Sequence, residues 1–114
     1  MKITEASAGN ATILRLSGRL DASNSMALEA AVLPAIGGAG QRLLLDMTDV
    51  QYISSAGLRV MLMAAKQARA TGGGFAVFGM NNAVRTMFET PGFLRIIAAF
   101  ASEDEALADA GGRA

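Results

Sequence analysis

The sequence predicts an α/β fold: one domain with a mixed sheet of four to five strands, flanked by about four helices. Segments that read as strands alternate with segments that have helical spacing, which is typical of this class. Two strand segments are continuous apolar runs, as expected when a strand is covered on both faces in a parallel or mixed sheet. No repeat or linker divides the 114 residues, and a chain of this length buries roughly two thirds of its unfolded surface in one core. We therefore expect a single domain over residues 1–114.

The chain is predicted to begin with two paired strands. The residues ATILRLSG, 11–18, indicate a strand by their apolar positions. A short strand at residues 2–6 is expected to pair with it across the turn Gly9-Asn10.

Residues 22–36 are predicted to form a helix that begins at a polar cap and ends near a proline. The apolar residues at helical spacing are Met26, Leu28, Ala31, Val32 and Ala35. Asp21, Ser23 or Ser25 is available as the cap. Pro34 is expected to kink the last turn or to end the helix near Leu33.

The two continuous apolar runs enclose a second helix. RLLLDM, residues 42–47, and FAVFGM, residues 75–80, are both predicted to be buried strands. The segment between them has helical spacing from the paired serines Ser54 and Ser55 to about Ala70, and three consecutive glycines from Gly72 end it.

The C-terminal part is predicted to contain two short helices and one short strand. Asn81 or Asn82 is expected to cap the first helix, which Pro91 ends. A strand is expected at residues 94–98. Residues 102–105, SEDE, have the pattern of a capping box and predict the last helix.

The composition excludes most catalytic and metal-binding classes. The chain has no cysteine, histidine or tryptophan, so it lacks the usual general base near neutral pH and the common zinc ligands. Asp46 and Asp49 flank a predicted turn, which explains them better than a cation site does. We expect no cofactor, no metal and no enzymatic activity.

The charge balance gives no indication of nucleic acid or membrane binding. Ten basic and ten acidic residues give a formal net charge of zero, so no basic patch is expected to attract polyanions. The first residues lack the layout of a signal peptide, and no apolar run approaches the roughly 20 residues of a membrane span. The expected location is the cytoplasm.

The helix that starts at Ser55 is predicted to have one core face and one exposed face, because each residue advances about 100° around the axis. Small and apolar residues gather opposite Ser55 and define the core face: Gly57, Met61, Ala64 and Ala68. The exposed face carries Ser55, Arg59, Leu62, Met63 and Lys66. Leu62 and Met63 there are either ordinary exposed apolar residues or part of a docking surface, in which Met and Arg are enriched.

Three interpretations of the serine pair remain open at this point. Ser54 and Ser55 are helix caps, or one of them is a nucleophile, or Ser55 accepts a phosphoryl group from a separate kinase. A nucleophile is the weakest of these, because Lys66 is eleven residues along the same helix, about 16 Å away by helical rise, and cannot serve as its base. A phosphate at a helix N-terminus would meet free backbone amides and the favourable end of the helix dipole.

The segment DMTDVQYISSAGLRVMLMAAKQA, residues 46–68, resembles the central signature of the STAS domain family, in particular the stand-alone bacterial anti-sigma factor antagonists. GRLDAS at 18–23 and GFAVFGMNNAVRTMFETPGF at 74–93 also fit the family, and the resemblance covers about residues 2–110. It implies a mixed sheet of four to five strands flanked by helices, in agreement with the fold predicted above.

The resemblance also implies site residues and partners. Ser55 matches the family's phosphorylated serine, Gly57 and Leu58 match the Gly-Leu that follows it, and Asp21 matches an acidic residue near that serine. Unphosphorylated members bind an anti-sigma factor and so free the sigma factor. That anti-sigma factor is a serine kinase with the ATPase fold of histidine kinases. Phosphorylation releases the antagonist, and a PP2C-type phosphatase restores it.

One departure from the family pattern leaves two alternatives. Family members often have Asp immediately before the phosphorylated serine, where this chain has Ser54, so Ser54 is an alternative phosphorylation site. The alternative function is a constitutive STAS interaction module that is not phosphorylated. It predicts the same partner-binding surface: Asp21, Ser54, Ser55, Gly57, Leu58, Arg59, Leu62, Met63 and Lys66.

Overall fold

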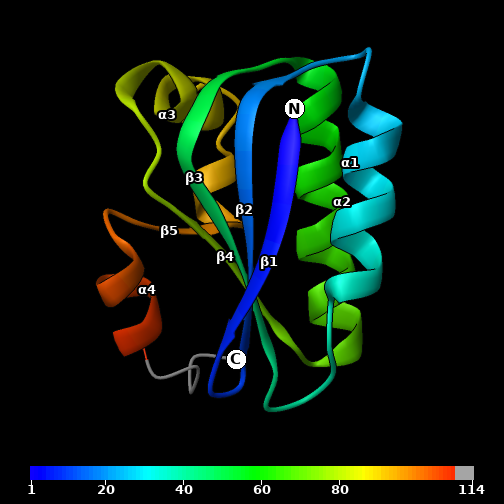
Figure 1. Cartoon of the computed structure of the whole chain (residues 1–114), viewed down its shortest axis with the longest axis vertical. Helices are drawn as coiled ribbons and strands as arrows, with labels where there is room; N and C mark the ends of the chain where they lie inside the picture. Colours follow the sequence, from blue (N-terminus) through cyan, green and yellow to red (C-terminus); the bar gives the residue numbers. More distant parts are fainter. Residues whose placement is uncertain (110–114) are drawn as a thin grey trace.

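Five strands form one mixed sheet, in which their spatial order is the same as their order along the chain (Figure 1). The computed structural model of the chain describes residues 1–109. β1 (Lys2–Ala8) runs antiparallel to β2 (Ala11–Leu20). β3 (Arg42–Ile53), β4 (Gly74–Phe78) and β5 (Ala98–Phe100) follow parallel to β2. The predicted α/β class with a mixed sheet is confirmed.

The helices divide unequally between the two faces of this sheet. One core cluster on one face contains the buried residues of α1 (Ser25–Val32) and α3 (Asn82–Glu89) and four of the six buried residues of α2 (Ser55–Thr71). The smaller cluster on the other face contains Ala106 of α4 (Glu103–Ala108), which Figure 1 shows opposite α1 and α2. Two short 3₁₀ helices, η1 (Leu33–Ala35) and η2 (Phe93–Arg95), follow α1 and α3.

The central strand β3 shows why its apolar run is continuous. Leu43 and Leu45 pack into the cluster beneath α1 and α2, whereas Leu44 packs into the cluster beneath α4. All three side chains are at most 1% exposed. Because successive side chains of a strand point to opposite faces, a strand covered on both sides needs apolar residues at every position.

β3 is longer than predicted and carries the chain to the start of α2. The expected strand ended at residue 47, but β3 continues to Ile53, paired with Leu20 of β2. Asp46 and Asp49 therefore lie within the strand, and the prediction that they flank a turn is wrong. The apolar pattern fails there because the register of β2 against β3 is irregular and Thr48, Asp49, Gln51 and Tyr52 are exposed.

The first helix begins later than predicted, and its cap is a different residue. α1 starts at Ser25 after Asn24, and none of the three predicted side-chain caps bonds to its amides. The Asn24 side chain instead stabilises the preceding loop: its oxygen accepts from the backbone N–H of Asp21, and its amide donates to the carbonyl of Arg19. The predicted ending is confirmed, since α1 ends at Val32 and the chain continues as η1 with Pro34 in its first turn.

The C-terminal elements follow the predicted order with one shift. Asn81 caps α3 through its side-chain oxygen, and Ser102 caps α4 in the same way. The strand expected at 94–98 is displaced, because residues 93–95 form η2 and β5 begins at Ala98.

Candidate functional site

Asp21 and the serine pair lie where parallel strands β2 and β3 end, at the top of the molecule in Figure 1. The backbone N–H of Ser54, directly after β3, donates to the carbonyl of Leu20, the last residue of β2, at 2.8 Å. This bond joins the two chain segments that carry Asp21 and the serine pair. The carboxyl ends of parallel strands are where α/β proteins generally place binding sites.

Ser54 is the N-cap of α2. Its backbone is extended, with φ −93° and ψ 175°, and its hydroxyl oxygen accepts from the N–H of Gly57 at 3.5 Å. The Ser54 carbonyl accepts the first intrahelical bond, from Leu58. The cap interpretation therefore accounts for Ser54.

Ser55 is the first residue of α2 and is exposed. Within residues 1–109, no side chain forms a hydrogen bond with its hydroxyl. A serine nucleophile needs a base within hydrogen-bonding distance, and none is present in the described part of the chain. Ser55 is available to an external enzyme but is not activated by its own protein.

Gly57 and Leu58 contribute packing rather than exposed surface. A Cβ atom on Gly57 would lie 2.8 Å from Cγ1 of Ile53 and 3.2 Å from the carbonyl oxygen of Leu20. Leu58 is 6% exposed and belongs to the main core. Both were expected to be partner-binding residues, but the structure places them beneath the surface, where they fix the start of α2 against the ends of β2 and β3.

The remaining predicted residues of α2 lie on its outer face. Ser55, Arg59 and Lys66 are exposed, and Leu62 and Met63 are half-buried beside them. The residues predicted to face the core are all buried: Gly57, Met61, Ala64 and Ala68. The two faces derived from helical spacing are confirmed.

Asp21 is engaged within its own loop. One carboxylate oxygen accepts from both the hydroxyl and the backbone N–H of Ser23, at 2.6 and 3.0 Å, and the other lies 3.8 Å from Arg19 Nε. The bonds from Ser23 lower the pKa of Asp21, so its carboxylate is ionised at neutral pH. The structure brings its loop beside Ser54, but no bond joins the Asp21 and Ser55 side chains in the described residues.

Sequence reasoning missed three exposed groups near this site. Met26 of α1 was named with the apolar residues at helical spacing, but it is 84% exposed. Arg19 stacks on the ring of Tyr52, with its guanidinium carbon 4.4 Å from the ring centre. Pairing of β2 with β3 places these two residues side by side, which spacing along the sequence does not show.

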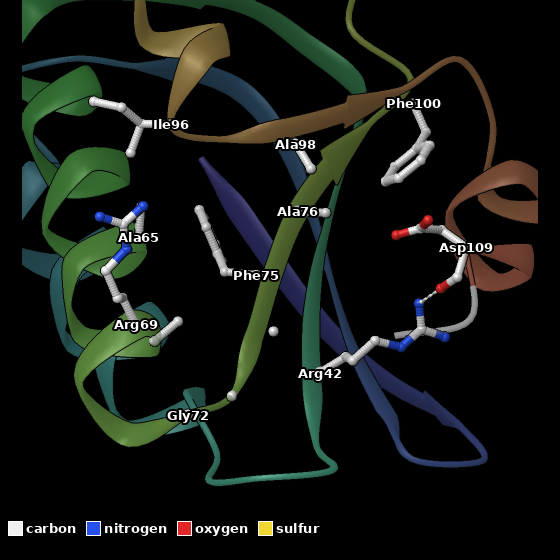
Figure 2. Close-up of a pocket in the computed structure, with 13 residues that line it drawn as sticks. Arg42, Ala65, Arg69, Gly72, Phe75, Ala76, Ile96, Ala98, Phe100 and Asp109 are labelled. Carbon is white, nitrogen blue, oxygen red and sulfur yellow. Dashed lines mark hydrogen bonds between the residues drawn. The ribbon is translucent and has the colours of Figure 1, made fainter. Parts of the chain in front are cut away.

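A cavity of about 420 Å³ lies elsewhere, at the edge of the sheet formed by β4 and β5. Figure 2 shows Arg69, Phe75 and Ile96 on one side of β4 and Arg42, Phe100 and Asp109 on the other. The Arg42 guanidinium donates to the backbone carbonyls of Ala106, Leu107 and Asp109, so it holds the end of α4. The cavity contains none of the predicted site residues and lies at the far end of α2 from Ser55.

Neither a metal site nor a membrane span is found in residues 1–109. They contain no group of three or more acidic side chains placed to hold a metal ion. Asp46, considered above as part of a cation site, instead pairs with Arg15 at 2.9 Å. No helix among these residues is long and apolar enough to cross a membrane.

The chain is similar to anti-sigma factor antagonists in sequence and in fold. A sequence model described as "Mlab, STAS domain" matches residues 3–98. A protein of Bordetella bronchiseptica, provisionally assigned as the anti-sigma factor antagonist BtrV, is 36% identical over 108 residues, covering 95% of this chain and 93% of that protein.

Solved structures show the same fold. An anti-sigma factor antagonist from Mycobacterium paratuberculosis superposes with a TM-score of 0.84 at 20% identity, covering 94% of this chain and 91% of the other. Unphosphorylated SpoIIAA gives 0.78 at 21% identity and 97% coverage of both chains. Phosphorylated SpoIIAA of Bacillus gives 0.68 at 17% identity, covering 94% of this chain and 97% of the other.

The chain therefore belongs to the STAS domain family. The resemblance predicted from residues 46–68 is confirmed, and the relatives described above are anti-sigma factor antagonists.

Proposed function

We propose that this protein is a non-enzymatic, cytoplasmic anti-sigma factor antagonist that works by partner switching. In its unphosphorylated form it binds an anti-sigma factor, a serine kinase of the histidine-kinase-like ATPase fold, and so frees a sigma factor. Phosphorylation of Ser55 by that kinase releases it, and a PP2C-type phosphatase restores the binding form. The observation that carries this proposal is the exposed, unbonded Ser55 hydroxyl at the start of α2, in a chain of this family.

Ser55 is a better phosphate acceptor than Ser54 for a structural reason. The Ser54 hydroxyl caps α2, whereas the Ser55 hydroxyl has no partner among residues 1–109. A phosphate on Ser55 would sit at the N-terminus of a 17-residue helix, near amides that lack intrahelical partners and near the positive end of the dipole. The helix thus tolerates the modification. SpoIIAA, whose fold matches, has been solved in both phosphorylation states.

Phosphorylation would change the outer face of α2 strongly. A phosphoserine adds about −1.5 to −2 charges at neutral pH to a face with half-buried Leu62 and Met63. Placing that charge in a partly apolar interface costs desolvation, and the loss of affinity is of the order of a few kcal/mol. Arg59, one turn after Ser55, is positioned to pair with the new phosphate or with an acid of the partner.

The test is the intact mass of the purified protein after incubation with ATP and each candidate kinase from the same genome, followed by peptide mapping across residues 43–59. We expect one phosphate, on Ser55. Ser54→Asn is the matched control, because Asn keeps the helix cap but has no hydroxyl, and it should still gain the phosphate. Ser55→Ala should gain none and should remain bound to the kinase in the presence of ATP.

Other outcomes would assign the chain differently. Phosphate on wild type that is lost in Ser54→Asn would move the switch to Ser54. Tight binding of a kinase without any phosphate, together with equal affinity of Ser55→Ala and Ser55→Asp, would indicate the constitutive STAS interaction module.

A further inference from the structure

Helix α2 carries an unusual set of charges. In a chain with equal numbers of basic and acidic residues, α2 has three cations, Arg59, Lys66 and Arg69, and no carboxylate. All three are exposed. Relative to Ser55, they lie at about 40°, 20° and −40° around the axis, by the rotation of about 100° per residue. They form one line along the outer face, which we call the basic ridge.

The basic ridge has no ionic partner in the described part of the protein. The four ion pairs among residues 1–109 use the cations Arg15, Arg19 and Arg85. None of them involves a residue of α2. The three cations of the basic ridge are therefore left to solvent.

The stability of the helix does not explain the basic ridge either. Arg59 lies close to the N-terminus of α2, where the dipole disfavours cations, and the first turn has no acid to offset it. Lys66 and Arg69 are three positions apart, a spacing at which like charges destabilise a helix. Only Arg69, in the last turn, is placed where the dipole favours a cation. The short helix α4, in contrast, has three acids in its first turn.

Apolar side chains lie beside the basic ridge. Leu62 and Met63 are half-buried on the same face. Helix α1 runs along α2 (Figure 1), and the Gln67 amide of α2 donates to the carbonyl of Leu33 just after α1. Met26, in the first turn of α1, adds the most exposed large apolar side chain of the described residues. Methionine packs adaptably against varied surfaces.

We propose that the basic ridge docks on an acidic surface of the partner protein, in which carboxylates flank apolar side chains. This inference rests on the proposed function and identifies the chemistry of the anti-sigma factor's docking surface. The basic ridge extends about 21 Å from Ser55 to Arg69 by helical rise, so it supplies attraction well beyond the phosphorylated residue. Complementary charge of this kind mainly accelerates association.

With this geometry, phosphorylation of Ser55 weakens partner binding in two ways. A phosphate on Ser55 lies at the end of the basic ridge, one turn from Arg59. It neutralises part of the attraction and also faces the partner's carboxylates as a like charge. Release of the partner then follows from charge alone, without a change of fold.

The test compares charge changes on and off the basic ridge. Lys66→Glu is on it. Lys2→Glu is the matched control, because Lys2 is exposed, forms no ion pair among the described residues and precedes Ile3, whose side chain packs into the α2-side core. Its own side chain therefore points to the opposite face of the sheet. Arg69→Gln removes a charge at the end farthest from Ser55. The probes are the recombinant ATPase-fold anti-sigma factors of the same genome, and association rates are measured between about 20 and 500 mM NaCl, a range over which screening changes strongly.

We expect Lys66→Glu to slow association by about 10-fold or more at low salt and to flatten its salt dependence. Arg69→Gln should show a smaller effect, and Lys2→Glu should match wild type. The maximal rate of Ser55 phosphorylation should be unchanged in Lys2→Glu, and urea unfolding checks that each of the three variants is folded.

Two results would overturn this inference alone: normal association and salt dependence of both ridge variants, or an equal effect of Lys2→Glu. In either case wild type would still bind its kinase and gain phosphate on Ser55. Failure of every anti-sigma factor to bind wild type would overturn the proposed function and this inference together.

Discussion

Helices α2 and α4, on opposite faces of the sheet, are attached in different ways. α2 is attached by apolar burial, with six buried residues, and its three cations have no ionic partner among residues 1–109. α4 has one buried residue, Ala106, and is held at both ends by arginines of the sheet. Arg15 bonds Glu103 at 2.8 Å and also Asp46, while Arg42 donates to the carbonyls of residues 106, 107 and 109. Charges that hold α4 in place are unavailable to a partner, whereas those of α2 are free.

The largest expected effect tests the apolar attachment of α2. Met61 is completely buried, so Met61→Ala should lower the free energy of unfolding by about 2–5 kcal/mol through lost burial and a cavity. Met63→Ala is the matched control, since the half-buried Met63 side chain should contribute less than about 1.5 kcal/mol. Urea unfolding measures both. Equal losses of unfolding free energy in the two variants would show that the core face of α2 contributes no more to stability than its outer face.

The next effect tests the arginine attachment of α4. Arg42→Met keeps the apolar stem but removes three bonds to helix carbonyls, and we expect a loss of about 1–3 kcal/mol. Amide hydrogen exchange should accelerate in residues 103–108 and stay unchanged in β3 around Leu44. Arg95→Met, a change at an exposed arginine without an ion pair in the described residues, serves as control. Normal protection of α4 in Arg42→Met would contradict the comparison.

Asp46 pairs with Arg15, the arginine that also bonds Glu103 of α4, and this carboxylate should make the stability of the protein depend on pH. Burial alone would raise the pKa of Asp46, but bonds from Thr48 and Arg15 outweigh it and hold that pKa below its ordinary value of 3.8. A carboxyl group with a depressed pKa in the folded state stabilises that state above pH 3.8, and this contribution is lost as pH falls through the folded-state pKa.

Wild type should therefore lose more stability below pH 3.8 than Asp46→Asn, which lacks the carboxylate at every pH. Urea midpoints recorded from pH 5 to pH 2, taken as the difference between the two proteins, measure this contribution. Parallel curves would show that the ionised Asp46 does not stabilise the folded state.

The smallest expected effect is that of basic-ridge charges on stability. Lys66→Glu should change the free energy of unfolding by less than about 0.5 kcal/mol, because Lys66 is exposed and forms no ion pair in the described residues. A loss above about 1 kcal/mol would mean that Lys66 serves the fold, and its effect on partner binding would then need a different explanation.

Local patterns predict α2 well, because its determinants are local. The Ser54 cap, the spacing of the buried face and the Gly72 terminator, at φ 80°, all lie within or next to the helix. The later start of α1 was missed, since the Asn24 side chain bonds to loop atoms and caps none of the helix amides. The continuation of β3 to Ile53 was missed because pairing with β2, not an apolar pattern, maintains it.

The attachment of α4 could not be derived from sequence spacing. Arg15 and Glu103 are 88 residues apart, and Arg42 lies 64 residues before Ala106. Arg15 and Arg42 lie in strand segments and Glu103 lies in a capping box, and neither local pattern indicates a distant bonding partner. In the candidate site, helical rotation predicted which residues lie on the outer face of α2. It could not predict the burial of Leu58, which depends on how closely Gly57 lets α2 approach Ile53.

The short strand β5 has a consequence for solubility. It pairs with β4 only from Ala76 to Phe78, so Gly74 and Phe75 lie at an open edge of the sheet in the described structure. Such an edge invites strand addition by another copy of the chain and thus aggregation. Arg42 and Arg69 flank this edge (Figure 2). Two copies that met there would bring the exposed Arg69 side chains close together, and this like-charge repulsion would disfavour assembly through the sheet.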